Sequence, residues 1–256
     1  MAVPLLLATA CGGGGDGDEA EKRPGASKAT ATAKGSSGAT TGPVVDADPA
    51  RLPTTRKAAL DLIGKVIADP ENFGPGVVAR TPYESGPDSW PVLDRNCVWQ
   101  QGDPGRGILA TLTRSFEVPA AKGKGPLRLA AIMTVHRTDD GARWEMAESI
   151  EETMRCPTQQ LRQGEFIGGL GAGALGRGEA NQDNSEDSLM ESGEYRSNEL
   201  GGPHPYFWEQ DQILRFTFAV TAKGAKGWTD EEITDLSAQA QSTMLIRLHQ
   251  AVGKKG

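Results

Sequence analysis

The chain has 256 residues, a formal net charge of −7 at pH 7 and a calculated isoelectric point near 5.1. Its Lys and Arg residues are dispersed along the sequence, which argues against a surface that binds the phosphates of nucleic acids. No run of about eighteen or more apolar residues occurs, so any attachment to a membrane has to be covalent or peripheral.

Residues 5–10, with the sequence LLLATA, precede Cys11 and resemble the end of a bacterial lipobox. By this resemblance, Cys11 is diacylated and becomes the first residue of a mature protein that its lipid holds at the membrane. No Lys or Arg precedes the short apolar stretch, and a translation start further upstream would explain this. The alternative is a hydrophobic N-terminus with a free thiol.

Residues 12–53 consist mainly of Gly, Ala, Ser, Thr, Lys and Asp. Such a segment cannot bury enough apolar surface to offset its backbone entropy, so it is predicted to be a disordered linker. Behind a lipidated segment 1–11 it would act as a flexible spacer. The rest of the chain is predicted to form one extracytoplasmic domain over 54–252 and a short tail over 253–256.

Apolar residues at helical spacing, with Pro70 directly after them, predict a first helix over 54–69. Extended segments are predicted at 96–101, 107–118 and 126–137. In the second of these, apolar side chains alternate with hydroxyl-bearing and charged ones, which is typical of a strand with one packed face and one wetter face.

The sequence KGKG at 122–125 predicts a hairpin between the last two of those segments. A second helix is predicted from Asp139 to Met154. Its apolar stripe, which we expect to pack inward, consists of Trp144, Ala147, Ile150 and Met154. The glycine-rich residues 164–184 are predicted to form a long surface loop.

Further strands are predicted at 188–198, 205–210 and 212–222. Thr229 and Glu232 form a capping-box pattern that opens a final helix. The order of elements predicts an α+β fold, in which an antiparallel sheet of about six strands has three helices packed mainly on one face. The disordered tether precedes it.

With Cys11 assigned to lipid, Cys97 and Cys156 remain as a pair in a chain destined for an oxidising compartment. A disulfide is therefore predicted, with a stabilising effect on the order of 4 kcal/mol in the chain-entropy model. The alternatives are a nucleophilic thiol or a metal site, but the three histidines, His136, His204 and His249, are not at metal-ligand spacing.

Two motifs are matched only in part. Gly171, Gly173 and Gly176 spell G-x-G-x-x-G, but no helix is predicted after them, which favours a flexible loop over a dinucleotide site. The second motif is a calcium loop, for which a solvated loop running into a strand is the favoured alternative because Ser188 stands where the turn glycine belongs. The residues that match ligand positions of this loop are Asp183, Ser185, Asp187 and Glu194.

Large polar and aromatic side chains lie on or beside the predicted strands, Trp90 among them. If the helices cover one face of the sheet, the other face forms a groove that such residues line. The candidate lining residues are Trp99, Arg114, His136, Tyr195, Trp208 and Arg215. The alternative is that the tryptophans pack in the core or at its rim and the arginines pair with surface acids.

The lipobox, the tether, RNCVWQ at 95–100, MRCPTQQL at 154–161 and KGWTDEEI at 226–233 resemble actinobacterial secreted lipoproteins. The layout is more loosely similar to the extracytoplasmic sensor domains of actinobacterial receptor-type serine/threonine kinases, and to cell-wall lipoproteins with a Mog1/PsbP-like sheet. The resemblance implies an envelope ligand bound in a cleft. Those kinase domains carry a second disulfide, which this chain lacks.

Two functions follow as hypotheses. The first is a non-catalytic envelope lipoprotein, without cofactor or bound metal, that binds a small-molecule, lipid or cell-wall ligand or a membrane protein partner. The second is a secreted hydrolase or transferase of unfamiliar type that uses His136 or His204 with an acid such as Asp139 or Glu209. No Gly-x-Ser-x-Gly motif and no zinc signature supports the second hypothesis.

Overall fold

The computed structural model describes residues 45–86, 88–173 and 185–254, all within one compact unit. Cys11 and most of the predicted linker lie outside the described residues. Residues 45–53, predicted as the end of that linker, instead belong to the folded part. Asp48 N–H donates to Val252 O at 2.8 Å, and Ala47 pairs with Gly253, so this segment is fixed to the C-terminal helix.

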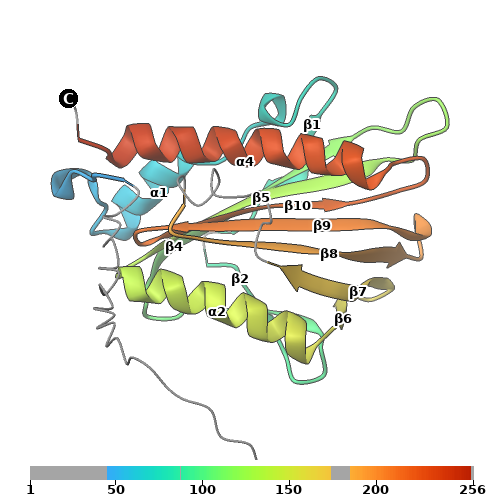
Figure 1. The fold of residues 1–256 in the computed structure, drawn as a ribbon, viewed down its shortest axis with the longest axis horizontal. Helices are drawn as coiled ribbons and strands as arrows, with labels where there is room; N and C mark the ends of the chain where they lie inside the picture. The colour runs from blue at the N-terminus through green and yellow to red at the C-terminus, as the bar shows by residue number, and fades with distance from the viewer. Residues whose placement is uncertain (1–44, 87, 174–184, 255–256) are drawn as a thin grey trace, which may run out of the picture. The chain divides into compact units, whose positions relative to one another are not determined.

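The main sheet has eight strands, and every neighbouring pair is antiparallel (Figure 1). In spatial order these are β1 (Val78–Glu84), β4 (Ile108–Val118), β5 (Leu127–His136), β10 (Phe216–Lys223), β9 (Gly201–Ile213), β8 (Asp187–Ser197), β7 (Glu165–Gly173) and β6 (Thr158–Arg162). A separate two-stranded sheet pairs β2 (Trp90–Leu93) with β3 (Trp99–Gly102). The predicted α+β class is confirmed, but the predicted number of six strands is too small.

The glycine-rich segment predicted as a surface loop over 164–184 contains strand β7. Its glycines are compatible with a strand because neighbouring backbone approaches them closely: a Cβ atom on Gly193 of β8 would lie 2.7 Å from Gly168 O of β7. The register between these two strands shifts after Gly168, near Gly169 with its φ of 60°. Glycine therefore marks a bulged, close-packed strand pair here.

The predicted hairpin at 122–125 is confirmed. Ala121 and Lys124 exchange backbone hydrogen bonds of 3.1 and 3.0 Å, which close the turn between β4 and β5. Lys122 and Gly123 both have positive φ, at 43° and 87°. This combination is the backbone geometry that a tight two-residue hairpin requires.

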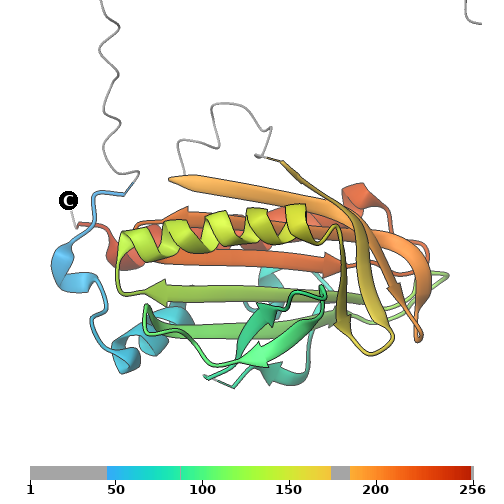
Figure 2. The same ribbon diagram turned by 90° about the horizontal axis from the view of Figure 1, so that it is seen from below.

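The described residues form three α-helices, α1 (Arg56–Val66), α2 (Asp139–Arg155) and α4 (Asp230–Val252). Helices α1 and α4 cover one face of the sheet and α2 lies on the other (Figures 1 and 2). The prediction that the helices pack mainly on one face is therefore wrong for α2. None of these helices is long and apolar enough to cross a membrane.

The two faces of the sheet differ in chemistry. Phe216, Phe218 and Val220 of β10 join the main hydrophobic core, which α1 and α4 close. Thr217 and Thr221 alternate with these residues along the strand and point to the opposite face, toward α2. The core is thus sealed on the side of α1 and α4, and a polar sheet surface remains beneath α2.

Helix α2 packs on this surface with the side opposite to the one predicted. The predicted inward stripe faces away from the sheet, since the exposed fractions of Trp144 and Met154 are 75% and 78%. Ala142, Met146 and Thr153 are the buried residues instead. The inward side of α2 thus combines these residues with the polar side chains of Glu145, Ser149 and Glu152, and the apolar stripe is left outside.

Candidate ligand-binding site

A cavity of about 450 Å³ lies between α2, the β2–β3 sheet and the polar face of the main sheet. Figure 2 views this face, with α2 and the β2–β3 strands lying across it. The volume falls within the range of about 300 to 1,000 Å³ that small-molecule sites occupy. The cavity has a floor, an aromatic wall and an acidic wall.

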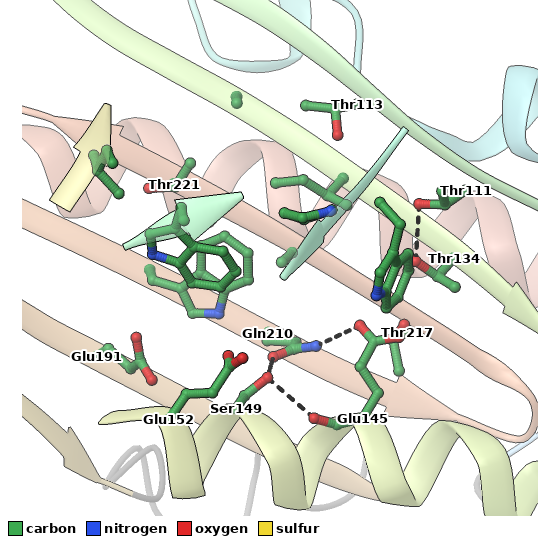
Figure 3. Close-up of a pocket in the computed structure, with 18 of the residues that line it drawn as sticks. Thr111, Thr113, Thr134, Glu145, Ser149, Glu152, Glu191, Gln210, Thr217 and Thr221 are labelled. Carbon is green, nitrogen blue, oxygen red and sulfur yellow. Dashed lines mark hydrogen bonds between the residues drawn. The ribbon is translucent and has the colours of Figure 1, made fainter. Parts of the chain in front are cut away.

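Hydroxyl groups form much of the floor. They come from three adjacent strands and belong to Thr111, Thr113, Thr134, Thr217 and Thr221 (Figure 3). The hydroxyl oxygens of Thr111 and Thr134 lie 3.1 Å apart, and Thr221 donates to Phe207 O at 2.9 Å. The floor thus offers polar contacts without a fixed charge.

Indole rings form the aromatic wall. Trp90 and Trp99 belong to the β2–β3 sheet and Trp208 to β9, so three of the five tryptophans of the chain line one cavity. Trp99 Nε1 donates to Gln159 Oε1 at 2.7 Å, which fixes its ring against β6. The indole N–H groups of Trp90 and Trp208 donate to no other residue in the described part of the chain, so both remain available to a ligand.

Carboxylates form the acidic wall. Glu145, Glu148 and Glu152 lie on successive turns of α2 and line the cavity. Glu191 of β8 lies beside Glu152 (Figure 3). Glu191 is only 7% exposed, and its carboxylate accepts a hydrogen bond from Thr153 Oγ1. Four acidic side chains thus surround one side of the cavity.

Burial changes the protonation of these acids. It raises the pKa of Glu152 from 4.5 to about 7; the charges of Glu148 and Glu191 also raise it, while Arg155 opposes the shift. Burial likewise raises the pKa of Glu191, against the effect of the Thr153 hydrogen bond. Near neutral pH, Glu152 is therefore shared between its protonated and ionised forms.

The cavity has little positive charge to balance these acids. Among the described residues, no salt bridge includes Glu148, Glu152 or Glu191. Lys223 lines the cavity, but its Nζ lies 2.9 Å from Glu165 Oε1. Burial alone would raise the pKa of Glu165, but Lys223, Tyr195 and Arg162 together outweigh that effect, and the pKa falls to about 2.

The carboxylate of Glu145 is held by a histidine ring and a glutamine amide. Its Oε2 lies 2.7 Å from Nε2 of His136, and its Oε1 accepts from Gln210 Nε2 at 2.9 Å. Ser149 Oγ donates to Gln210 Oε1 at 2.9 Å. This network fixes α2 against β5 and β9 at one end of the cavity.

The predicted disulfide between Cys97 and Cys156 is confirmed, with a Cα–Cα distance of 5.5 Å. Cys97 lies in the turn between β2 and β3, and Cys156 is the C-cap of α2. Gln160 N–H of β6 donates to Cys97 O at 2.8 Å. The aromatic and acidic walls are therefore joined covalently.

Of the six candidate groove residues, Trp99 and Trp208 line the cavity. His136 lies at its edge through the contact with Glu145. Tyr195 is fully buried in a separate cluster, where its hydroxyl donates to Glu165 Oε1 at 2.9 Å. The structure thus brings only part of the predicted set together.

The two arginines of that set lie elsewhere. Arg114 has its guanidinium on the α1 side of the sheet, 2.7 Å from Asp69 and 2.9 Å from Glu84. Arg114 therefore points to the same face of β4 as the apolar residues of that strand. Arg215 follows β9 and lies 3.7 Å from Asp139.

The histidine pairs expected for a hydrolase do not form as predicted. The partner of His136 is Glu145, because Asp139 lies beside Arg215. Glu209 lies on the face of β9 that points away from the cavity. On that face Asp211, two residues further along the strand, accepts a hydrogen bond from Gln241 of α4. His204 Nε2 lies 2.9 Å from Leu200 O.

Neither of the two partial motifs forms a binding site among the described residues. Gly171 and Gly173 lie in β7 rather than in a phosphate-binding turn, and Gly176 lies outside the described residues, as does Asp183 of the calcium pattern. Asp187 and Glu194 share strand β8, whose rise separates them by about 23 Å, too far to hold one ion. In the described ranges, no three His, Cys, Asp or Glu side chains are placed to hold a metal.

Sequence reasoning missed the acidic wall and most of the floor. The alternation of threonines in β4 indicated a wet face, and Thr134, Thr217 and Thr221 repeat it in the neighbouring strands. The spacing of Glu145, Glu148 and Glu152 indicates one side of a helix. Nothing local shows that this side faces inward.

No family model matches the chain, and no curated protein matches it significantly in sequence. Among solved structures, it is similar to the extracellular domain of PknH from Mycobacterium tuberculosis, with 11% identity, a TM-score of 0.46 and coverage of 76% of this chain and 98% of that chain. It is also similar to the Rv0999 orthologue from Mycobacterium smegmatis, with 10% identity, a TM-score of 0.35 and coverage of 78% and 99%. At these TM-scores, the similarities carry no inference about function.

Proposed function

We propose that this chain is a non-catalytic cell-envelope protein that binds an amphipathic small molecule in the cavity beneath α2. One observation carries the proposal: a cavity of about 450 Å³ has indole rings on one side and four carboxylates on the other. The carboxylate of Glu191 is buried, and those of Glu145 and Glu152 are partly buried. An apolar body and a polar group on the same ligand would both find partners there.

A purely structural role explains this arrangement poorly. Carboxylates without an ion-pair partner lose hydration when they are buried, and this destabilises the folded state. The polar side of α2 nevertheless faces inward, while Trp144 and Met154 are exposed. Clusters of acids with shifted pKa values in a cavity are a frequent property of functional sites.

The location is part of the proposal. A lipid on Cys11 would anchor the chain, and residues 12–44 would serve as a tether that holds the cavity clear of the bilayer. The disulfide between Cys97 and Cys156 supports an oxidising compartment outside the cytoplasm. Ligand binding would then be sensed or relayed through a membrane protein partner.

Blocking the cavity tests the ligand site. Ala130→Phe places a ring in the cavity, whereas Ala147→Phe places the same ring on the exposed side of α2. A fluorescence and thermal-shift screen of envelope lipids and cell-wall fragments should find saturable binding to the wild type and to Ala147→Phe. The proposal fails if no compound binds, or if binding survives in Ala130→Phe.

A hydrolase is the second candidate, and the contact between His136 and Glu145 favours it. The nearby hydroxyl of Thr217 lies 3.5 Å from the same ring nitrogen, Nε2, that faces Glu145. One nitrogen cannot both activate a hydroxyl and bond the orienting carboxylate, so a triad relay does not follow. Hydrolysis of model esters that His136→Gln abolishes would favour this candidate over the first.

A further inference from the structure

We infer that the ligand carries an organic cation, an amine or quaternary ammonium group on an apolar body, and that the cation lies between Glu152 and Glu191. The inference rests on the proposed function, since it names the chemical class that the same cavity selects. It follows from the charge of the cavity, from its aromatic wall and from the geometry of its carboxylates.

The charge of the cavity favours a cation. Glu152 of α2 and Glu191 of β8 lie side by side in the cavity wall (Figure 3). Glu148 lies on the preceding turn of the helix. Within the described part of the chain, none of the three has an ion-pair partner, and Lys223 is bound to Glu165. A ligand cation would supply the missing charge, whereas an anion would add to the repulsion.

The aromatic wall favours the same group. Trp90, Trp99 and Trp208 present indole rings to the same cavity. Indole is the aromatic side chain that attracts cations most strongly, and the combination of indoles with carboxylates is the usual chemistry of ammonium recognition. The apolar part of the ligand would pack on the same rings and on Ile132 and Ile167.

The placement of the carboxylates favours an organic cation over a metal ion. Calcium takes six to eight oxygen ligands at about 2.3 to 2.6 Å, which requires several carboxylates to converge. No three acidic or other metal-binding side chains do so among the residues that the structure describes. A diffuse ammonium group needs no such convergence, because it is attracted by charge and by ring faces.

The protonation of Glu152 adds a testable consequence. The charges that act on it are those of Glu148, Arg155 and, most weakly, the exposed Glu151 on α2, and that of Glu191 on β8. A bound cation favours the ionised form of Glu152, so binding at pH 6 releases a proton that binding at pH 8 does not. As the pH rises toward 7, the affinity for the cation should therefore increase by up to about tenfold per pH unit, and above pH 7 it should level off.

The test compares three probes of equal size on the 256-residue chain by titration calorimetry at pH 7.5. These are 4-phenylbutylamine, 4-phenylbutanol and 4-phenylbutyrate, which are cationic, neutral and anionic. We expect the amine to bind at least tenfold more tightly than the alcohol, and the acid to bind most weakly. Equal or tighter binding of the alcohol or the acid would overturn the cation inference but retain the ligand site, and no binding by any probe would overturn both.

Matched variants locate the cation. The double variant Glu152→Gln/Glu191→Gln should lose at least tenfold in affinity for the amine and keep its affinity for the alcohol, which also shows that it is folded. Glu151→Gln, on the exposed side of the same helix, should bind the amine as the wild type does. Unchanged amine binding by the double variant, or displacement of the amine by stoichiometric calcium, would contradict the inference.

Discussion

Cys97 and Cys156 join two walls of the cavity that are far apart in sequence. The first residue lies in the turn between β2 and β3, which carry Trp90 and Trp99, and the second is the C-cap of α2. The same bond that stabilises the fold thus holds the aromatic wall at a fixed place relative to the acidic one.

Removal of this bond should lower both stability and affinity. For the double variant Cys97→Ala/Cys156→Ala, we expect a loss of about 2 to 4 kcal/mol in the free energy of unfolding, because a loop of 59 residues is no longer closed in the unfolded chain. Urea denaturation measures the loss. A reductant should destabilise the wild type and leave the variant unchanged, and a loss below about 0.5 kcal/mol would contradict the expectation.

Glu152→Gln should stabilise the protein at pH 8. The pKa of Glu152 is raised to about 7 in the folded state, so this state binds more protons than the unfolded one between about pH 4.5 and pH 7. Stability due to this group therefore falls as pH rises through that window. The full shift corresponds to about 3 kcal/mol, and partial exposure reduces the expected gain to about 1 to 2 kcal/mol.

Denaturation of this variant at pH 5 and pH 8 measures the effect. The gain should be present at pH 8 and largely absent at pH 5, where Glu152 of the wild type is protonated in the folded state. Glu151→Gln serves as the control, because it removes the same charge from an exposed position of the same helix. An equal gain in both variants would assign the effect to net charge alone.

The orientation of α2 predicts opposite results for two neighbouring residues. Met146 is 1% exposed, and Met146→Ala should cost about 2 to 5 kcal/mol of unfolding free energy through lost packing. Trp144→Ala should change it by less than about 0.5 kcal/mol, because the indole is largely in solvent. A larger effect at Trp144 than at Met146 would mean that α2 packs by its apolar stripe.

Arg114→Met should lower stability without changing ligand binding. The guanidinium is bound to Asp69 and Glu84 on the α1 side of the sheet. Its loss leaves Glu84 without its cationic partner, while Asp69 keeps its ion pair with Arg247. We expect a loss of about 1 to 3 kcal/mol. The affinity for 4-phenylbutylamine should remain that of the wild type, and a selective loss of affinity would return Arg114 to the site.

Cys11→Ser tests the proposed anchor. In the native host, the wild type should fractionate with membranes and carry diacylglycerol on Cys11, as mass spectrometry of its N-terminal peptide would show. The variant should appear in the soluble fraction. Cys97→Ala should leave the location unchanged, and membrane retention of Cys11→Ser would contradict lipid anchoring.

The sequence predicted those elements whose local pattern agrees with their environment. Helix α4 was predicted because its capping box is complete: Thr229 Oγ1 accepts from Glu232 N–H, and Glu232 Oε2 accepts from Thr229 N–H, both at 3.2 Å. Strands β4 and β5 were predicted from their alternation and from the turn between them. Strand β7 was missed because its glycines carry no side-chain pattern, and β1 and β2 because Pro82 and Pro91 interrupt theirs.

The site was predicted less well for a physical reason. An apolar stripe such as that of Trp144 and Met154 normally packs inward, but α2 lies over a sheet face that carries five threonine hydroxyls among its apolar side chains. The correct orientation depends on that face, which only the assembled sheet defines. The pairing of Glu152 with Glu191 likewise joins a helix and a strand that no sequence pattern links.

The indole N–H signals of the five tryptophans offer the most direct test of the cavity as a ligand site. In a nitrogen-15 NMR titration with 4-phenylbutylamine, the signals of Trp90, Trp99 and Trp208 should shift and saturate together. Those of Trp144 and Trp228 should stay in place, because neither residue lines the cavity. Shifts confined to Trp144 or Trp228, or no shift in any signal, would contradict the account.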